Sequence, residues 1–411
     1  MNRTIEPVSA LRGEISVPGD KSISHRSIMF GSLAEGTTCV SGFLTGEDNL
    51  ATLNAFAAMG VTIRRIGETS LEIEGRGLDG LEEPGDVIDC GNSGTTMRLM
   101  TGLLAGQKFF SVLTGDQYLR RRPMKRVVGP LAQMGAQIAG RRGGELAPLA
   151  IQGTELQSTT YHSPVASAQV KSALLLAGLS AEGETTVYEP SLSRDHSERM
   201  LSWFGAELTP FDGGVTIKGR PHLKAQEVQV PGDISSAAFF MVAGLVTPGS
   251  ELLIRNVGVN PSRSGIIDIL RAMGGQIELL DERNPSGEPI ADILVKSSRL
   301  QGIEIGGDLV PRAIDEFPVI SIAAALAEGT TIIKDARELR VKETDRIAAM
   351  VDGLTVLGAD VEAQEDGMVI NGCEQLQGGQ VVSHGDHRIA MSFAVAALNS
   401  SGPVTIEDTE C

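Results

Sequence analysis

The segment FAAMGVTIRR (residues 56–65) decides the fold, because it joins the end of a helix to the start of a strand at a single glycine. Glycine after a bulky apolar residue is typical of a helix that ends in the left-handed region, and the residues after Gly60 alternate with the period of a strand. Four other segments repeat this junction: LAQMGAQIAG (131–140), LSWFGAELTP (201–210), LRAMGGQIEL (270–279) and LTVLGADVEA (354–363). One copy alone would indicate only a common helix–strand junction, whereas five copies indicate an internal repeat.

The junction glycines are 75, 70, 69 and 84 residues apart, which predicts one compact unit of helices and a small sheet per copy. Extending this spacing places a sixth glycine near position 430, roughly, so we expect the last unit to be incomplete. The phrase Val-Pro-Gly-Asp occurs at 17–20 and again at 230–233, where the chain would cross between two halves. We therefore expect an α/β fold of two similar lobes. One is residues 20–232 and the other is residues 1–19 plus 233–411, with crossovers near 19–20 and 232–233.

Composition narrows the classes of partner. The chain has 411 residues, of which 35 are basic and 52 acidic, and its formal net charge is −17. This length suits two cores, and the acidic excess argues against nucleic acid or an anionic membrane as the main partner. The four cysteines have no metal-ligand spacing, the first twenty residues contain no apolar run of signal-peptide length, and we expect no membrane-spanning run. We expect a cytoplasmic protein without disulfides.

Positive charge is informative in so acidic a chain, and the stretch VPGDKSISHRS (17–27) concentrates it behind a turn. Lys21 and Arg26 could hold phosphate or carboxylate oxygens from two sides, beside backbone N–H groups exposed by the turn. The second copy, VPGDISSAAFF (230–240), has no lysine or arginine and therefore indicates a structural turn.

Other motifs suit anions or hydroxyl groups, although each also has a structural interpretation. GNSGTTMR (91–98) fits an anion at a helix N-terminus or an ordinary capped helix, and YLRRRPMKR (118–126) is a binding cluster or a solvated face. Ser167 and Gln169 could bind a polyol or simply cap a helix. Asp315 precedes an apolar run and is a candidate base or a first-turn acid. Lys342, Glu343 and Arg346 could equally form helix salt bridges. His384, Asp386 and His387 suggest a metal, but the adjacent Arg388 would repel a cation, so no metal is expected.

Seven motifs stand in one order along nearly the whole chain: PGDKSISHR, GNSGTTMR, RRPMKR, ASAQVKSA, IDEFP, LRVKETDR and HGDHRIAM. Together they closely resemble the 5-enolpyruvylshikimate-3-phosphate synthase family, the 3-phosphoshikimate 1-carboxyvinyltransferases. The resemblance implies two lobes of three βαβαββ units each, an inside-out α/β barrel-like arrangement that closes on substrate. It also implies transfer of the enolpyruvyl group of phosphoenolpyruvate to the 5-hydroxyl of shikimate 3-phosphate, with release of phosphate and with no metal or organic cofactor.

The resemblance also implies site residues. Shikimate 3-phosphate would be held by Lys21, Ser22, Arg26, Ser167, Ala168, Gln169, Arg194, Asp315 and Lys342. Phosphoenolpyruvate would be held by Lys21, Gly94, Arg122, Gln169, Arg346 and Arg388. Asp315 would be the general base, and Glu343, helped by Lys21, would be the proton donor. Glycine at position 94 leaves room for the inhibitor glyphosate, and a monomer is expected.

Two rival functions remain open on the sequence. The sister enolpyruvyltransferase that uses UDP-N-acetylglucosamine shares the chemistry but typically has Lys-Asn where this chain has Lys21-Ser22. A ligand-binding remnant without catalysis is the second rival, motivated by the incomplete sixth unit, and the family usually has a further helix there.

Overall fold

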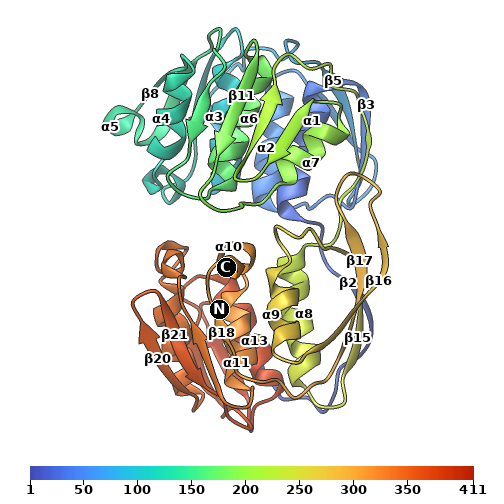
Figure 1. Ribbon diagram of the computed structural model, residues 1–411, viewed down its shortest axis with the longest axis vertical. Coiled ribbons are helices and arrows are strands. Elements are labelled where there is room, and N and C mark those ends of the chain that lie inside the picture. The colour runs from blue at the N-terminus through green and yellow to red at the C-terminus, as the bar shows by residue number, and fades with distance from the viewer. The chain divides into compact units, whose positions relative to one another are not determined.

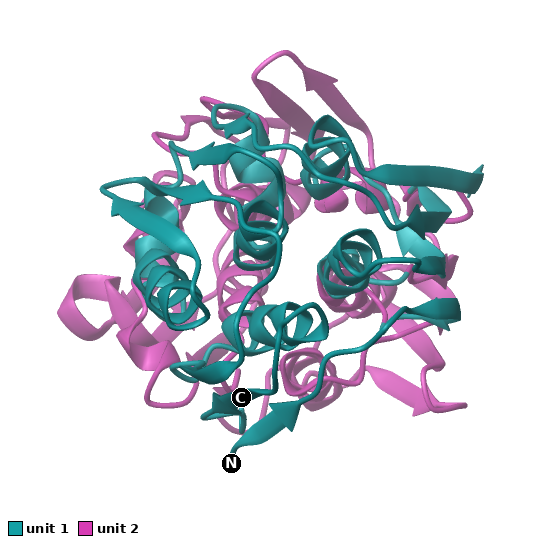
Figure 2. Cartoon of the chain, turned by 90° about the horizontal axis from the view of Figure 1, so that it is seen from below, with its two compact units in different colours: residues 1–18, 232–283, 289–411 teal, residues 19–231, 284–288 magenta.

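The computed structural model describes residues 1–411, and the chain divides into two compact units. Unit 1 comprises residues 1–18, 232–283 and 289–411, and unit 2 comprises residues 19–231 and 284–288 (Figure 2). Each unit has a hydrophobic core of its own, built from residues of that unit alone. Two separate cores are what a chain of this length requires.

The short segment 284–288 differs from the boundaries expected from the sequence, which left it in the C-terminal half. It lies in unit 2 because the Ser286 hydroxyl accepts a hydrogen bond from the Gln229 N–H at 2.9 Å. Its carboxylate at Glu288 also bonds the His196 imidazole, with Oε1 and Nδ1 2.8 Å apart. The other boundaries fall one residue earlier than expected, at 18/19 and 231/232.

Unit 2 alternates helices and short strands along the chain. Its elements are α1 (Lys21–Leu33), β3 (Glu35–Ser41), α2 (Glu47–Ala58), β4 (Thr62–Arg65), β5 (Leu71–Arg76), β6 (Ile88–Asp89), α3 (Gly94–Ala105), β7 (Phe110–Thr114), the 3₁₀ helix η1 (Leu119–Arg121), α4 (Lys125–Gln133), β8 (Gln137–Gly140), α5 (Arg141–Gly144), β9 (Leu146–Gln152), β10 (Thr160–His162), α6 (Ala168–Ser180), β11 (Glu184–Tyr188), α7 (His196–Trp203), β12 (Leu208–Phe211), β13 (Gly214–Lys218) and β14 (Glu227–Gln229).

Unit 1 begins with the N-terminal strands and continues after the second crossover. Its elements are β1 (Arg3–Ile5), β2 (Arg12–Ser16), α8 (Ile234–Val246), β15 (Glu251–Gly258), α9 (Gly265–Ala272), β16 (Gln276–Arg283), β17 (Ile290–Lys296), β18 (Glu304–Ile305), α10 (Leu309–Ala313), α11 (Phe317–Ala325), β19 (Thr330–Ile333), the 3₁₀ helix η2 (Arg337–Val341), α12 (Arg346–Val356), β20 (Asp360–Gln364), β21 (Gly367–Asn371), β22 (Gly379–Val382), α13 (His387–Leu398) and β23 (Val404–Glu407).

One sheet pattern recurs through both units. In the order β6-β7-β9-β8 the first two strands are parallel and the remaining pairs are antiparallel, so the segment reads βαβαββ. The orders β10-β11-β13-β12 and β18-β19-β21-β20 repeat it. Figure 1 shows the helices of each unit on the inner side of these sheets. The expected α/β fold of small repeated sheets is therefore confirmed.

Two of the sheets take their first strand from a distant part of the chain. Strand β14 pairs in parallel with β3, and strand β2 pairs in parallel with β15. Each of these strands is followed by a Val-Pro-Gly-Asp turn and then by a helix of the other unit, α8 after β14 and α1 after β2. The duplicated turn therefore marks the two crossovers. The sixth sheet has three strands, β22, β23 and the N-terminal β1.

The junction glycines adopt the conformation that the repeat predicts. Gly60, Gly135, Gly205, Gly274 and Gly358 have φ values between 80° and 101°. A residue with a Cβ would be strained there, whereas glycine lets the chain leave the helix and enter the next strand.

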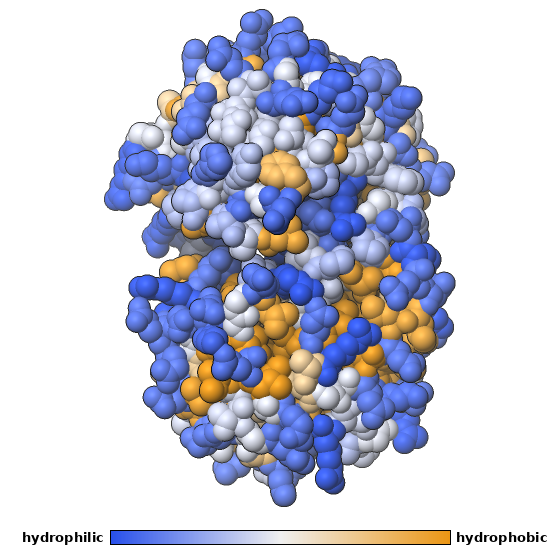
Figure 3. Space-filling view, in the orientation of Figure 1, coloured by the Kyte–Doolittle hydropathy of each residue, from blue (hydrophilic) through white to orange (hydrophobic).

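The helices of unit 1 are apolar on most sides, α8 (ISSAAFFMVAGLV) and α11 (FPVISIAAA) above all. Almost all residues of these two helices are buried. Figure 3 shows hydrophobic side chains at the surface of the part of the molecule that Figure 1 draws below, which is unit 1. Even so, no helix of either unit combines the length and apolar character that a membrane crossing needs.

Candidate active site

The first turn of α1 presents the basic motif of unit 2. Asp20 caps the helix, its Oδ1 accepting from the Ile23 N–H at 2.8 Å, and this fixes the orientation of the residues that follow. Lys21 Nζ forms an ion pair with Asp48 Oδ2, and the backbone carbonyl of Lys21 accepts from Asn49. The lysine ammonium is half exposed at 48% of its side chain, so it can leave Asp48 for a ligand.

Arg26 lies one turn further into α1 and is almost fully buried. Its Nε donates to Ser197 Oγ at 2.8 Å and its Nη2 to Ser172 Oγ at 2.9 Å, so the guanidinium joins α1 to α7 and α6. Nη1 donates to the Ser22 carbonyl at 3.0 Å. Burial lowers the pKa of Arg26, the charges of Glu198, Asp20 and Glu288 oppose this shift, and the charge of Arg194 adds a smaller lowering effect.

The second cluster joins the first turns of α3 and α6. Arg98 Nη1 donates to Gln169 Oε1 at 2.8 Å, and Gln169 Nε2 donates to Thr95 Oγ1 at 3.1 Å. Burial, followed by the charges of Arg126 and Arg122, lowers the pKa of Arg98 to about 10. Three guanidinium groups close enough to affect one another form a site that a bound anion would stabilise.

Gly94 is the first residue of α3 and lies against this cluster. A Cβ at this position would be 2.7 Å from Arg98 Nη1 and 3.4 Å from Arg122 Nη1. Arg122 itself is held by Asn92, whose Oδ1 accepts from Nη2 at 2.7 Å. Glycine at position 94 therefore lets two arginines approach the N-terminus of a helix, where the helix dipole also favours an anion.

Behind the start of α6 lies a buried ion-pair network centred on Lys171. Its Nζ is 2.7 Å from both Glu189 Oε2 and Glu198 Oε1, and it donates to the Ser193 carbonyl at 3.4 Å. Glu189 Oε1 in turn accepts from the N–H of Ser167, the cap residue of α6, at 3.3 Å. The network therefore fixes the helix start at Ser167 and Ala168 and the loop that carries Arg194.

Unit 1 contains the remaining predicted residues, gathered around the carboxylate of Asp315. Lys342 Nζ is 3.9 Å and Arg346 Nη1 is 3.8 Å from Asp315 Oδ1. Arg388 Nη1 donates to the backbone carbonyl of Asp315 at 3.1 Å. The Asp315 side chain is 17% exposed, so the carboxylate is reachable while Lys342 and Arg346 lie beside it.

Arg346 is the most buried of these cations, with 2% of its side chain exposed. Its Nε donates to Asp386 Oδ2 and its Nη2 to Glu343 Oε2, both at 2.7 Å. Burial opposes its charge, but Asp386, Glu343 and Asp315 outweigh this and raise the pKa of Arg346. Its Nη1 is buried and donates no hydrogen bond within the chain, so this nitrogen is suited to a ligand oxygen.

The stretch from Glu338 to Arg346 is not one helix, in contrast to the salt-bridged helix considered from the sequence. The 3₁₀ helix η2 ends at Val341, and α12 begins at Arg346 with Asp345 as its cap. Lys342 and Glu343 therefore lie in the connection. Lys342 pairs with Glu338 at 2.8 Å, whereas Arg346 pairs with Glu343.

The structure thus forms two groups from the predicted residues. Unit 2 carries Lys21, Ser22, Arg26, Gly94, Arg122, Ser167, Ala168, Gln169 and Arg194, and unit 1 carries Asp315, Lys342, Glu343, Arg346 and Arg388. Two neighbours were not assigned from the sequence. Arg98 was visible as a basic residue one turn into an apolar helix, whereas no sequence signal distinguished Asp48 from other surface acids.

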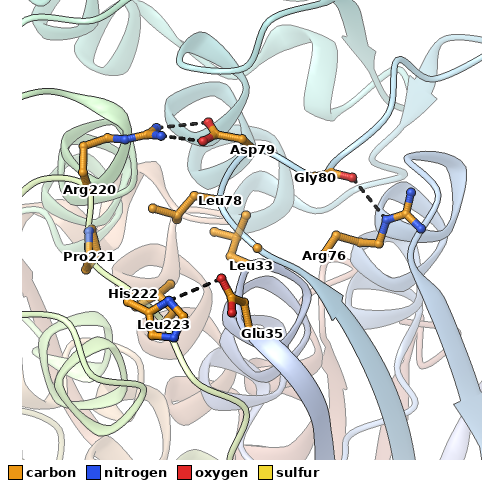
Figure 4. Close-up of a pocket in the computed structure, with 11 residues that line it drawn as sticks. Leu33, Glu35, Arg76, Leu78, Asp79, Gly80, Arg220, Pro221, His222 and Leu223 are labelled. Atoms are coloured by element: carbon orange, nitrogen blue, oxygen red, sulfur yellow. Dashed lines mark hydrogen bonds and ion pairs between the residues drawn. The ribbon is translucent and has the colours of Figure 1, made fainter.

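A separate cavity of about 340 Å³ in unit 2 contains none of these residues (Figure 4). It lies at the opposite end of α1, beside Leu33, and its lining includes an ion pair between Arg220 and Asp79 and a contact between His222 Nδ1 and Glu35 Oε1 at 3.3 Å. Because the two arginines of the lining, Arg76 and Arg220, already pair with Glu82 and Asp79, neither is left to bind an anionic ligand.

Comparisons with known proteins agree on one family. The sequence model of the family described as EPSP synthase (3-phosphoshikimate 1-carboxyvinyltransferase) matches residues 5–411. A 3-phosphoshikimate 1-carboxyvinyltransferase of Syntrophotalea carbinolica is 70% identical over 410 residues, which is 100% of this chain and 95% of that protein. One of Geotalea uraniireducens is 68% identical over 408 residues, 99% of this chain and 95% of that protein. The 2.37 Å structure of EPSP synthase from Acinetobacter baumannii is similar with a TM-score of 0.93 and 50% identity, covering 100% of this chain and 94% of the other.

Proposed function

The chain belongs to the EPSP synthase family of 3-phosphoshikimate 1-carboxyvinyltransferases, and from that premise we propose which of its residues carry the reaction. The enzyme transfers the 1-carboxyvinyl group of phosphoenolpyruvate to the 5-hydroxyl of shikimate 3-phosphate and releases phosphate. Both substrates are anions, which the basic groups of the two clusters suit.

Shikimate 3-phosphate is assigned to the α1 and α6 helix starts together with three residues from elsewhere. The assigned residues are Lys21, Ser22, Arg26, Ser167, Ala168, Gln169, Arg194, Asp315 and Lys342. The first N–H groups of α6 have no partner within the helix, and its dipole favours a phosphate at this end. The hydroxyl and amide groups of Ser167 and Gln169 suit the hydroxyls of the substrate.

Phosphoenolpyruvate is assigned to the guanidinium groups around Gly94 and around Asp315. The assigned residues are Lys21, Gly94, Arg122, Gln169, Arg346 and Arg388. Arginine binds carboxylate and phosphate through two parallel hydrogen bonds, and Nη1 of Arg346 makes no hydrogen bond within the chain, its nearest carboxylate oxygen being Asp315 Oδ1 at 3.8 Å.

Asp315 is the proposed base, and its cationic surroundings are the observation that carries the assignment. It takes the proton of the 5-hydroxyl as that oxygen bonds to C2 of phosphoenolpyruvate, while C3 gains a proton. In the second step the C2–phosphate bond breaks and C3 loses a proton, which restores the double bond. Lys342 and Arg346 near Asp315 Oδ1 favour the ionised carboxylate that the first step needs.

Glu343, helped by Lys21, is the proposed donor of the proton to C3. In the structure Glu343 Oε2 accepts from Arg346 Nη2 at 2.7 Å, so it lies beside a guanidinium assigned to phosphoenolpyruvate. A phosphoenolpyruvate carboxylate that bonds Arg346 would compete with this pair, and Glu343 could then take up the proton that it donates.

The test is Asp315→Asn, with Glu338→Gln as its matched control. Both carboxylates pair with Lys342, but the Glu338 side chain is 62% exposed. Asp315→Asn should lower kcat by about a hundredfold or more, the usual effect of losing a general base. The control should turn over like the parent enzyme. Near-normal turnover of Asp315→Asn would refute the assignment.

We also propose that glyphosate competes with phosphoenolpyruvate. The lack of a side chain at Gly94 supports this, because a Cβ there would displace the guanidinium groups of Arg98 and Arg122. Inhibition that does not weaken as phosphoenolpyruvate is raised would contradict it. A monomeric state and a cytoplasmic location stay predictions, and sedimentation analysis would test the first.

A further inference from the structure

A buried ion pair between Arg263 and Glu316 lies directly beside Asp315. Arg263, in the loop before α9, is 5% exposed, and Glu316, the cap residue of α11, is 1% exposed. Arg263 Nη1 donates to Glu316 Oε1 at 2.9 Å and to Oε2 at 3.0 Å. The hydroxyl of Ser235 on α8 donates to Glu316 and accepts from Arg263 Nη2. Three segments of unit 1 thereby hold the guanidinium in one orientation.

This locked guanidinium lies on the Oδ2 side of the Asp315 carboxylate. Arg263 Nη2 is 3.9 Å from Asp315 Oδ2, whereas Lys342 and Arg346 approach Oδ1. The same nitrogen is 4.0 Å from Oδ1 of Asp233, the cap of α8. Asp233 and Ser235 belong to the second Val-Pro-Gly-Asp segment, which therefore contributes to this cluster although it lacks basic residues.

Glu316 also links the pair to a second proposed site residue. Its Oε1 is 3.7 Å from Arg388 Nη1, and that nitrogen donates to the carbonyl of Asp315. The pair Arg263–Glu316 thus borders both the proposed base and a guanidinium assigned to phosphoenolpyruvate.

We propose that Arg263, locked by Glu316 and Ser235, is a positioning residue that orients the carboxylate of Asp315 and keeps it ionised during the reaction. The proposal rests on the proposed role of Asp315 as the base. Lys342 and Arg346 are assigned to substrate, so their charges are shared with its anions when it binds. Arg263 is held by buried partners and supplies a constant positive charge beside Oδ2. Such preorganised charge is how enzymes hold a reacting group in its working state.

The charged groups packed around Asp315 come from every neighbouring element. They are Asp233 at α8, Arg263 before α9, Glu316 at α11, Lys342 and Glu343 before α12, Arg346 on α12, and Asp386 and Arg388 at α13. Removing Arg263 alone would leave Glu316 buried without its main partner, and the variant could fail to fold. Removing both charges of the pair avoids this.

The test therefore compares the double variant Arg263→Met/Glu316→Gln with the parent enzyme and with Arg263→Lys. The readout is kcat at saturating substrates between about pH 5 and 9, after circular dichroism has verified folding. The double variant should move the acid limb of kcat upward, but by less than the roughly 1 pH unit that loss of a lone cation within 4–6 Å would give, because removing the Glu316 charge partly offsets removing that of Arg263. Arg263→Lys keeps the charge and should keep most of the acid limb in place.

The matched control is Arg255→Met/Asp292→Asn, which removes another arginine–carboxylate pair of unit 1, with Nη1 and Oδ2 2.6 Å apart. It should leave the acid limb unchanged. A folded Arg263→Met/Glu316→Gln variant with the parent acid limb would overturn the proposal, and so would an equal shift in the control. If Asp315→Asn is impaired while the double variant is normal, only the role of Arg263 fails. If Asp315→Asn turns over normally, Asp315 is not the base, and the proposal for Arg263, which rests on it, is wrong as well.

Discussion

Replacing Lys171 by Met should destabilise unit 2 in a pH-dependent way. The Lys171 side chain is 2% exposed, and its partners Glu189 and Glu198 are 4% and 12% exposed. Burial opposes the ammonium charge, but Glu198 and Glu189 outweigh it and raise the pKa of Lys171. Without the lysine, two buried carboxylates face each other with no cation between them.

The magnitude follows from the cost of breaking a buried ion pair, which is about 3–5 kcal/mol. In a domain of roughly 200 residues this lowers the unfolding midpoint by about 6–20 °C at neutral pH. The two carboxylates of the variant would bind protons more tightly in the folded state than in the unfolded state. Stability should therefore fall as the pH rises above the unfolded Glu value of 4.5, so the loss is larger at pH 8 than at pH 5.

Burial also raises the pKa of Glu198 in the parent, but Lys171 opposes that shift, so the same fall should be smaller there. A raised pKa of Lys171 means that its contribution is complete below the unfolded value of 10.5 and is lost only as the pH rises through the folded value. The assay is the unfolding midpoint by calorimetry at pH 5 and pH 8, together with the KM for shikimate 3-phosphate. That KM should rise, because Glu189 holds Ser167 and Lys171 holds the Ser193 carbonyl beside Arg194.

The matched control is Lys218→Met, which breaks the ion pair with Glu207 at 2.9 Å. Both of its side chains are more than half exposed, so the midpoint should hardly change. Adding Glu189→Gln and Glu198→Gln to Lys171→Met should recover most of the lost stability. An equal effect of the two lysine replacements, or a loss that is the same at pH 5 and pH 8, would refute the reasoning.

Three further predictions concern single positions. In Gly94→Ala the new Cβ would lie 2.7 Å from Arg98 Nη1 and should displace that guanidinium. Steady-state kinetics should then show a KM for phosphoenolpyruvate raised by about tenfold, which corresponds to roughly 1.4 kcal/mol. Burial disfavours the charged form of His196, but Glu288 outweighs burial and raises the pKa of the imidazole. The pair therefore stabilises the fold fully below pH 6.5 and less as the pH rises through the folded pKa. Glu288→Gln should flatten this pH dependence of the unfolding midpoint. Burial raises the pKa of the Cys90 thiol to about 12, so mass spectrometry should find it unlabelled by iodoacetamide in the native protein and labelled after denaturation.

The repeat was predictable because it depends on local chemistry. Gly60 and its four counterparts end helices in the left-handed region, and that requirement is visible in the sequence as a glycine between a helical and a strand pattern. The pairing of β2 with β15 and of β14 with β3 was only hinted at by the duplicated turn, because strand pairing across about two hundred residues leaves no local signal.

The candidate site, too, was predictable where it depends on local motifs and not where it depends on contacts between distant residues. Lys21, Arg122 and Arg346 belong to motifs that could be read in order along the chain. The sequence does not show which carboxylate each cation pairs with, because partners such as Arg346 and Asp386 are forty residues apart. The pair Arg263–Glu316 was invisible for this reason, because its two residues are 53 positions apart. Segment 284–288 was misplaced because one histidine and one serine contact decide its unit.

The most direct measurement is phosphate release by the purified protein given phosphoenolpyruvate with shikimate 3-phosphate, with each substrate alone, and with UDP-N-acetylglucosamine as the alternative acceptor. Stoichiometric release with the shikimate pair alone is the predicted result. Release with UDP-N-acetylglucosamine, or no release with any acceptor from a folded protein that binds shikimate 3-phosphate, would contradict the account.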